Sequence, residues 1–393
     1  MTMVRLAWRY LAARPLLTAL HVVLLALGAG TIALLLLFTG QAEERLERDA
    51  GSVDLVVGAK GSPLQLILSS VLHADVPTGN IPLEAVERLA ADPMVAEAIP
   101  ISLGDSYRGF RIVGTQPAFL ALHHGAIAQG GIFTGEMEAV LGAQVAKRTG
   151  LALGATFAGS HGLAAAGGAT HGDHPYKVVG ILAPTGSVID RLVTTPLESV
   201  WQVHGAHGAA PQAREVTAVL LRYRTPIAAA VLPRRINATT ALLAASPAYE
   251  GARLMNLVGV GVDALGVFAL VLMASAALSV FIALTSALQE RRYDLALLRM
   301  LGASPAKLFV LVAAEGMTLV VAGVILGLVV GHVAAEALGR WLAASQTWSL
   351  TGIAWAPGEA WLAALALVLG SATCAIPAIL AYRRDPASVL LER

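Results

Sequence analysis

The residues best suited to chemistry in this sequence are its histidines, because an imidazole binds transition metals and exchanges a proton near neutral pH. Eight of the ten histidines lie between His73 and His207. The densest group, in a Gly- and Ala-rich stretch, comprises His161, His171, Asp173 and His174. A loop carrying such side chains can supply the three or four ligands of zinc or another transition metal. The spacing matches no defined metal signature, so the alternative of solvated loop histidines stays open.

A second candidate is Glu315, a carboxylate within a long apolar run. Burying a carboxylate in lipid is costly, so an intramembrane glutamate is by default a functional candidate. The alternatives are a hydrogen bond to a neighbouring helix, or a side chain that reaches toward the interface. Glu315 is therefore predicted to be an intramembrane polar residue of undecided role.

The sequence elements that position these residues include membrane helices. Of the 393 residues 56% are hydrophobic and only 13% charged, far fewer charges than a soluble protein carries. Crossing the hydrocarbon takes about 20 helical residues. Four runs are long enough: Leu16 to Phe38, Leu257 to Leu288, Leu308 to Leu338 and Ala360 to Tyr382. The first is too long for the apolar core of a signal peptide, so it is interpreted as an anchor.

Charge and cysteine content exclude several functions. The 27 Lys and Arg nearly balance the 26 Asp and Glu, so there is no basic field to hold nucleic acid. The single cysteine, Cys374, excludes an internal disulfide framework and a CxxC metal knuckle. No G-x-x-x-x-G-K-[ST] motif is present to cradle ATP phosphates.

The short segments beside the runs indicate the orientation, because Lys and Arg resist translocation. Ten of them flank the N-terminus, the segment from Gln289 to Lys307 and the C-terminus, whereas the short loop after the third run has only Arg340. Both termini and the 289–307 segment are therefore predicted to be cytoplasmic. The long insert between the first two runs is predicted to lie outside.

The insert, residues 41–256, has a mixed pattern. Val53 to Val57, Tyr176 to Leu182 and Val216 to Leu221 favour strands, and Pro82 to Leu89 favours a helix with proline at its first turn. The predicted fold class is an α-helical membrane protein with four transmembrane helices plus a large α+β periplasmic domain inserted between helices 1 and 2. The predicted division is 1–40 for the N-terminal segment and first helix, 41–256 for the ectodomain and 257–393 for the remaining helices.

Two local patterns lie in the last part. Residues 289–304 are predicted to form an amphipathic helix along the membrane, ended by Gly302 before Pro305 opens the third span. Gly323, Gly327 and Gly331 recur every fourth residue, a small-residue row typical of close helix packing in lipid.

These phrases together resemble the FtsX/MacB-type permeases of ABC transporters, the mechanotransmission class that includes LolC and LolE. The segment from Glu290 to Ser304 is similar to the family's cytoplasmic loop, with its Leu-Leu-Arg-x-Leu-Gly-Ala-Ser ending. Glu315-Gly316 with the glycine row is similar to its third helix, and Arg383-Arg384-Asp385-Pro386 to its C-terminal tail. One departure is Tyr293-Asp294-Leu295-Ala296, where the family often has Thr, Glu, Ile and Gly.

The resemblance implies a non-catalytic permease subunit that works as a homo- or heterodimer with a separate ABC ATPase subunit, since the ATPase fused to MacB is missing here. The loop at 289–304 would be the coupling helix on that ATPase. Its expected contact residues are Arg291, Asp294, Leu298, Arg299 and Gly302. The chain itself would not bind ATP, because ATP would bind to the partner subunit. The cofactor expected on this chain is the metal on the ectodomain.

Two functions follow from the resemblance. The first is export or extraction of a substrate, metal-linked through the histidines, from the periplasm or the outer leaflet, with a periplasmic adaptor, a lipoprotein or an outer-membrane channel as further partner. The second is FtsX-like regulation of a periplasmic partner such as a cell-wall hydrolase, without transport. Both place the chain in the bacterial inner membrane, in contact with lipid and with no nucleic acid. A membrane-anchored metalloenzyme is disfavoured, because no HExxH-like arrangement is present.

Overall fold

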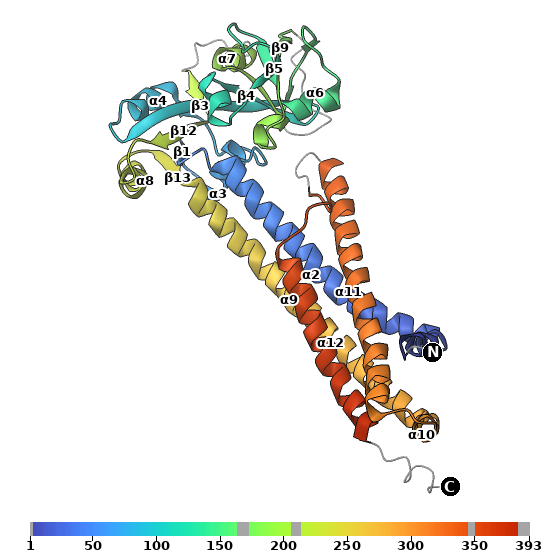
Figure 1. Ribbon diagram of the computed structural model, residues 1–393. Coiled ribbons are helices and arrows are strands. Elements are labelled where there is room, and N and C mark those ends of the chain that lie inside the picture. The colour runs from blue at the N-terminus through green and yellow to red at the C-terminus, as the bar shows by residue number, and fades with distance from the viewer. Residues whose placement is uncertain (1–2, 163–172, 206–213, 345–349, 384–393) are drawn as a thin grey trace. The chain divides into compact units, whose positions relative to one another are not determined.

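A computed structural model describes residues 3–162, 173–205, 214–344 and 350–383 (Figure 1). The chain divides into two compact units, which we treat separately. The helical unit comprises Met1–Ala42 and Val258–Arg393. The inserted domain comprises Glu43–Leu257.

The helical unit is built from long apolar helices and two short amphipathic ones. Within the described residues its helices are α1 (Met3–Ala12), α2 (Pro15–Ala50), α9 (Pro247–Glu290), α10 (Arg292–Met300), α11 (Pro305–Ala344) and α12 (Gly358–Arg383). The ends of α2 and α9 beyond Ala42 and before Val258 belong to the inserted domain. Of the described helices, α2, α9, α11 and α12 are long and apolar enough to cross a membrane, which confirms the four predicted spans.

The glycine row of α11 lies against α2. A Cβ atom added to Gly323 would meet Leu25, and one added to Gly327 would lie 2.7 Å from the Cβ of Ala29. At Gly331 the nearest atom is a backbone oxygen of α2, the carbonyl of Gly30, at 2.8 Å. Small residues on both helices therefore let the two backbones approach closely, as lipid-embedded helices require in order to associate.

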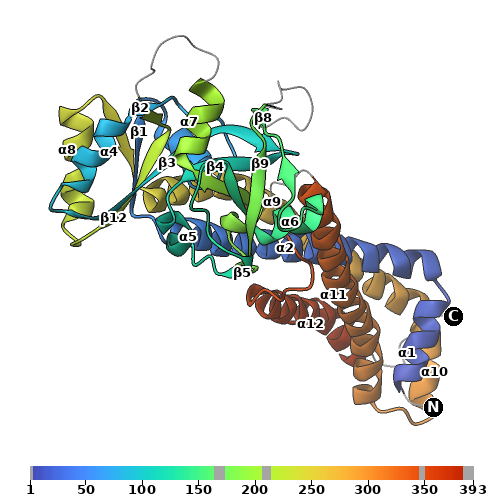
Figure 2. The same cartoon turned by 90° about the horizontal axis from the view of Figure 1, so that it is seen from above.

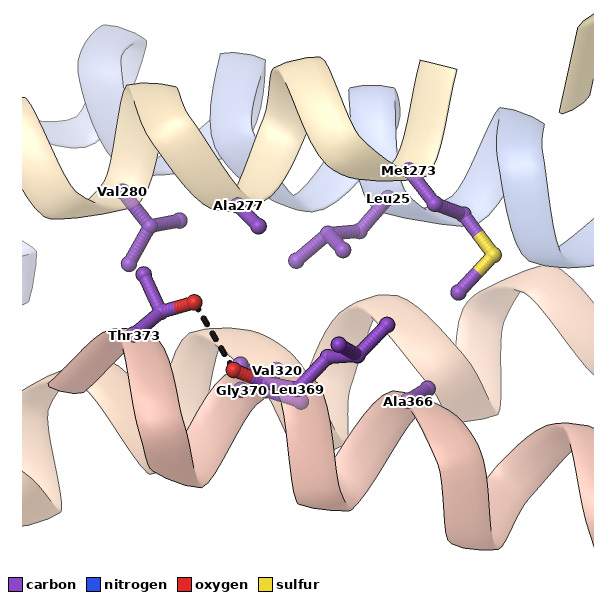
Figure 3. A pocket seen from close by; sticks show the side chains of 9 residues that line it. All are labelled: Leu25, Met273, Ala277, Val280, Val320, Ala366, Leu369, Gly370 and Thr373. Atoms are coloured by element: carbon purple, nitrogen blue, oxygen red, sulfur yellow. Dashed lines mark hydrogen bonds between the residues drawn. The ribbon is translucent and has the colours of Figure 1, made fainter. Parts of the chain in front are cut away.

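The centre of the bundle is apolar and nearly filled. A void of about 20 Å³ remains between α2, α9, α11 and α12, lined by the side chains in Figure 3. Its one hydroxyl, on Thr373, donates within its own helix to the Leu369 carbonyl at 2.7 Å. Because the lining offers no free polar group to bind an ordered water molecule, the void is a packing feature and not a ligand site.

The inserted domain is built around an 11-stranded mixed sheet. The main path runs β13-β1-β12-β3-β4-β10-β6-β9-β5, while β7 pairs with β9 and β8 with β3. Most neighbours are antiparallel, but β4 with β10 and β6 with β9 are parallel. The strands of this sheet are β1 (Leu55–Ala59), β3 (Val95–Tyr107), β4 (Phe110–Thr115), β5 (Ile127–Gly130), β6 (Glu138–Leu141), β7 (Thr156–Phe157), β8 (Ser160–His161), β9 (Tyr176–Leu182), β10 (Leu192–Pro196), β12 (Ala218–Tyr223) and β13 (Leu242–Ala245). A separate two-stranded ladder joins β2 (Ile81–Pro82) to β11 (Glu215–Val216).

Short helices cover this sheet (Figure 2). They are α3 (Pro63–Ser70), α4 (Leu83–Ala90), α5 (Ala118–Leu122), α6 (Ala143–Thr149), the 3-10 helix η1 (Val188–Arg191), α7 (Leu197–Gly205) and α8 (Ala228–Thr239). The expected strands at 53–57, 176–182 and 216–221 and the expected helix at 82–89 are confirmed as β1, β9, β11 with β12, and α4. In α4 the apolar Ala85, Val86 and Leu89 are buried on one face, as the period of a helix predicts.

Alternation along β9 explains why this segment is a strand with one face in the core. Tyr176, Val178, Gly180 and Leu182 are buried, while the residues between them are at least partly exposed. Tyr176 stacks on Phe157, which in turn contacts Tyr107. The domain thus has an apolar core of its own and does not depend on lipid to bury its side chains.

Candidate functional site

The candidate site is the end of the bundle where α9, α10 and α11 meet. Helix α9 continues through Glu290, and the chain turns at Arg291 before α10 begins at Arg292. Helix α10 ends at Met300, and Gly302 takes φ +92, a left-handed conformation that suits a glycine helix stop. The observed helix is therefore shorter than the predicted 289–304, because Gln289 and Glu290 still belong to α9.

Arg291 points into the bundle. Its Nη1 atom donates to Oε1 of Glu315 on α11 at 3.2 Å, and only 17% and 9% of the two side chains are exposed. The guanidinium carbon lies 3.8 Å from the ring centroid of Tyr10 on α1, a cation–π contact. One side chain at the α9–α10 turn thus joins α1 and α11. Glu315, which the sequence left undecided, has a buried ion-pair partner.

Helix α1 is held in the same corner. Ala7 is part of the buried bundle core, Leu6, Tyr10 and Leu11 pack against that core, and Arg5 is exposed. Just after α1, Arg14 forms an ion pair with Glu290 at the end of α9. The N-terminal segment is therefore attached to the α9–α10 turn by two contacts, one through the ring of Tyr10 and one through Arg14.

The face of α10 that is turned away from the bundle core is apolar and exposed. Tyr293, Leu297, Met300 and Leu301 are between 45% and 78% exposed. Their spacing of four, three and one places them on one side of the helix. Leu295 and Ala296, by contrast, are buried, and Leu298 packs against the bundle core. A helix buried on one face and apolar on the other is suited to bind a protein or a membrane surface on the open face.

The other residues predicted for coupling have less defined surroundings. The structure does not describe the side chain of Asp294, Arg299 is only partly buried, and no described atom lies within 4 Å of a Cβ added at Gly302. Their contact with an ATPase stays a prediction. Sequence reasoning missed the exposed row of Tyr293, Leu297, Met300 and Leu301, although its helical spacing was visible.

In the histidine-rich segment, the structure shows one contact between a histidine and a carboxylate. His161 in β8 places Nδ1 at 3.1 Å from Oδ1 of Asp105, a buried carboxylate in β3. Asp173 and His174 lie just before β9, and His171 is outside the described residues. Over the described ranges no three His, Cys, Asp or Glu side chains come together as a metal would require. Metal binding through His161, His171, Asp173 and His174 stays a prediction.

A second polar cluster is buried in the core of the inserted domain. His73 and His123 both contact Phe119, and Arg111 donates from Nη2 to the carbonyl of Asp75 at 2.7 Å. Neither ring nitrogen of His73 has a hydrogen-bond partner within the described ranges. Burial lowers the pKa of His123 to about 4, and burial and the nearby Arg111 lower the pKa of His73 well below its usual value. Both imidazoles are therefore neutral at pH 7.

Comparisons with known proteins agree with this architecture. The MacB-like periplasmic core domain matches residues 18–239, more than half of the chain. The FtsX-like permease C-terminal domain matches residues 266–386, which include α10 and the glycine row. A search of curated proteins found no match.

Two solved structures align with about half of this chain. The periplasmic region of MacB from Actinobacillus actinomycetemcomitans aligns with 53% of this chain and 96% of its own, at 10% identity and a TM-score of 0.37. The extracellular domain of the ABC-type transporter YknZ from Gram-positive bacteria aligns with 48% and 98%, at 13% identity and a TM-score of 0.32. The family models, together with four membrane-capable helices, show a multi-pass protein of the inner membrane. The chain belongs to the family of MacB-like ABC transporter permeases with an FtsX-like permease domain.

Proposed function

We propose that the chain is the non-catalytic permease subunit through which a separate ABC ATPase drives conformational change in the inserted domain, for export or extraction of a substrate from the periplasm or outer leaflet. Family membership implies the ATPase partner. The observation that carries the proposal for this chain is the exposed apolar row on α10. A soluble ATPase that covered Tyr293, Leu297, Met300 and Leu301 would remove these side chains from water.

The buried face of α10 supplies the second part of the proposal. A force applied to α10 would pass through the Arg291–Glu315 ion pair to α11 and through the Tyr10 contact to α1. Both contacts are short and largely buried, so they are stiffer than a water-exposed ion pair of two mobile side chains. In this proposal Arg291 is a positioning residue within the permease and does not itself contact the ATPase.

The orientation supports the same assignment. A cytoplasmic location of these segments is supported by the positive-inside rule, because basic residues lie before the first span and around α10: Arg5, Arg9, Arg14, Arg291, Arg292, Arg299 and Lys307. The ATPase would then meet α10 on the side where ATP is available. The inserted domain would lie in the periplasm, where an adaptor, an outer-membrane channel or a lipoprotein could bind it. A second permease copy completes the proposed assembly, and the proposal does not depend on a metal.

The test is site-specific photo-cross-linking in native membranes, with the reactive residue at position 297 of α10. The control position is Ile282 on α9, which is similarly exposed but lies within a predicted span. We expect an ATPase adduct from position 297 and none from position 282. Absence of an ATPase adduct at both positions would contradict the proposal.

The proteins recovered with the complex separate transport from regulation. An adaptor, an outer-membrane channel or a released lipoprotein supports export or extraction. An ATPase recovered together with a cell-wall hydrolase would overturn the transport assignment in favour of regulation without a transported substrate.

A further inference from the structure

The inserted domain contains a cavity of about 690 Å³ that the coupling proposal does not use. It lies between the last turns of α2 and the first turns of α9, and part of its wall comes from β12 and α8. Every residue that lines it belongs to the inserted domain. Its volume is in the range of sites that bind small organic molecules and far above that of the packing void in Figure 3.

The charge of this cavity has one sign. Glu43 and Glu47 on α2 and Asp54 before β1 contribute carboxylates, and the described residues that line the cavity include no Lys or Arg. Glu43 and Glu47 are four residues apart, so they lie on the same face of the helix, where two like charges repel each other. The neighbouring Arg48 is turned to Glu44 and to the carbonyl of Gly186. A cation in the cavity would relieve the repulsion.

Most of the remaining wall is apolar, with Ser246 and Asn256 as its polar members. Leu46, Ala252 and Met255 line it, and the ring of Tyr223 adds an aromatic surface. Burial and the nearby Asp54 raise the pKa of Tyr223 to about 12, so its hydroxyl keeps its proton at neutral pH and adds no negative charge. An aromatic face and carboxylates together attract a cation, and the aliphatic side chains add contact area for carbon atoms.

We propose that this cavity binds an organic cation with an apolar body, held by the carboxylates of Glu43 and Glu47 and by the apolar surface of Leu46, Met255 and Tyr223. A metal ion alone would leave the apolar wall unused, and a neutral apolar molecule would leave the carboxylates unpaired. The proposal concerns binding by this chain alone and does not rest on an ATPase partner.

The test uses the full chain in phosphatidylcholine nanodiscs, with ethidium and tetraphenylphosphonium as probes and empty nanodiscs as the blank. Binding of ethidium is followed by fluorescence anisotropy, and tetraphenylphosphonium is added as competitor. We expect saturable binding that weakens with salt. In Glu43→Gln/Glu47→Gln the dissociation constant should rise at least tenfold, and Ala252→Trp should block binding by filling the cavity while keeping its charge.

The matched control is Glu84→Gln/Glu87→Gln, which removes two exposed carboxylates from α4 of the same domain. This variant should bind ethidium as the unchanged chain does. Equal loss in the control would show a nonspecific charge effect and overturn the site. Absence of saturable binding of either probe, or binding unaffected by Ala252→Trp, would also overturn it.

Discussion

Two clusters, one in each unit, hold a buried cationic side chain in different ways. In the helical unit Arg291 is inserted among three helices, with the Glu315 carboxylate at 3.2 Å. In the inserted domain Arg111 is 5% exposed and donates to a neutral carbonyl oxygen, while His73 and His123 beside it are neutral. The Arg291 cluster balances its charge with an opposite charge, and the Arg111 cluster limits its charge by leaving imidazoles unprotonated. The first arrangement should therefore respond to substitution and the second to pH.

The largest expected effect comes from breaking the buried pair. Glu315→Ala leaves the Arg291 guanidinium without its carboxylate and should destabilise the chain by about 3–5 kcal/mol. Replacing both residues, in Arg291→Met/Glu315→Leu, should recover most of the loss, because no unpaired charge remains. The measurement is the thermal unfolding midpoint of the purified full chain in detergent.

The exposed ion pair of Arg14 and Glu290 is the matched control, since 40% and 54% of its side chains are exposed. Glu290→Ala should cost less than about 1 kcal/mol. If Glu290→Ala and Glu315→Ala lowered the midpoint equally, burial would not distinguish the two pairs and the comparison would fail.

The next effect is the pH response of the inserted domain. The pKa of His123 falls from 6.5 to about 4 on folding, and that of His73 falls too, so the unfolded chain binds more protons between these values. Stability is therefore highest above pH 6.5 and is lost as the pH falls toward 4. For His123 alone the loss at pH 4 is about 3 kcal/mol, because one pKa unit corresponds to about 1.4 kcal/mol.

Hydrogen exchange of the full chain measures this response by region. Corrected for intrinsic rates, peptides from β4 and α5 should lose protection between pH 6.5 and 4, while peptides from α11 should change less. His73→Phe/His123→Phe should flatten the profile of β4 and α5. An unchanged profile in this variant would assign the pH response to other groups.

The smallest effect tests the packing of the helical unit. A Cβ at Gly327 would lie 2.7 Å from that of Ala29, so Gly327→Ala should destabilise by about 1–3 kcal/mol through overpacking. At Gly261 on α9 no described atom lies within 4 Å of such a Cβ, so Gly261→Ala should be neutral or stabilising by up to about 1 kcal/mol. The measurement is the thermal unfolding midpoint of each variant. If both midpoints shifted in the same direction, α11 would not be closely packed against α2 at this row.

The spans and the alternating strands were predictable because each is specified by local pattern. Runs such as Leu16 to Phe38 carry enough apolar residues to require a helix, and Tyr176 to Leu182 alternates between core and surface by itself. The order of strands in the sheet was not predictable, because β1 pairs with β12 and β13 across more than 150 residues. No local sequence pattern indicates which of these distant strands pair with each other.

At the candidate site, sequence indicated the segment but not the roles of its residues. Arg291 was expected to contact the ATPase because of the family resemblance, yet its side chain faces Glu315 and Tyr10. These two residues come from other helices, and only the fold brings them together. The open row of Tyr293, Leu297, Met300 and Leu301 was hidden because an apolar helix beside a membrane is expected to face lipid. The cavity near Glu43 and Glu47 likewise needs two helices far apart in sequence.

The glycine row of α11 has one further consequence. Where long side chains of two helices interdigitate, one helix can slide along the other only if each side chain leaves its packing site. Such sliding therefore occurs in discrete steps. Gly327 and Gly331 meet Ala29, Gly30 and Ala33 without long side chains on either helix. The interface between α11 and α2 is smooth at this level, so small shear movements along the helix axis meet little resistance while separation of the helices remains costly.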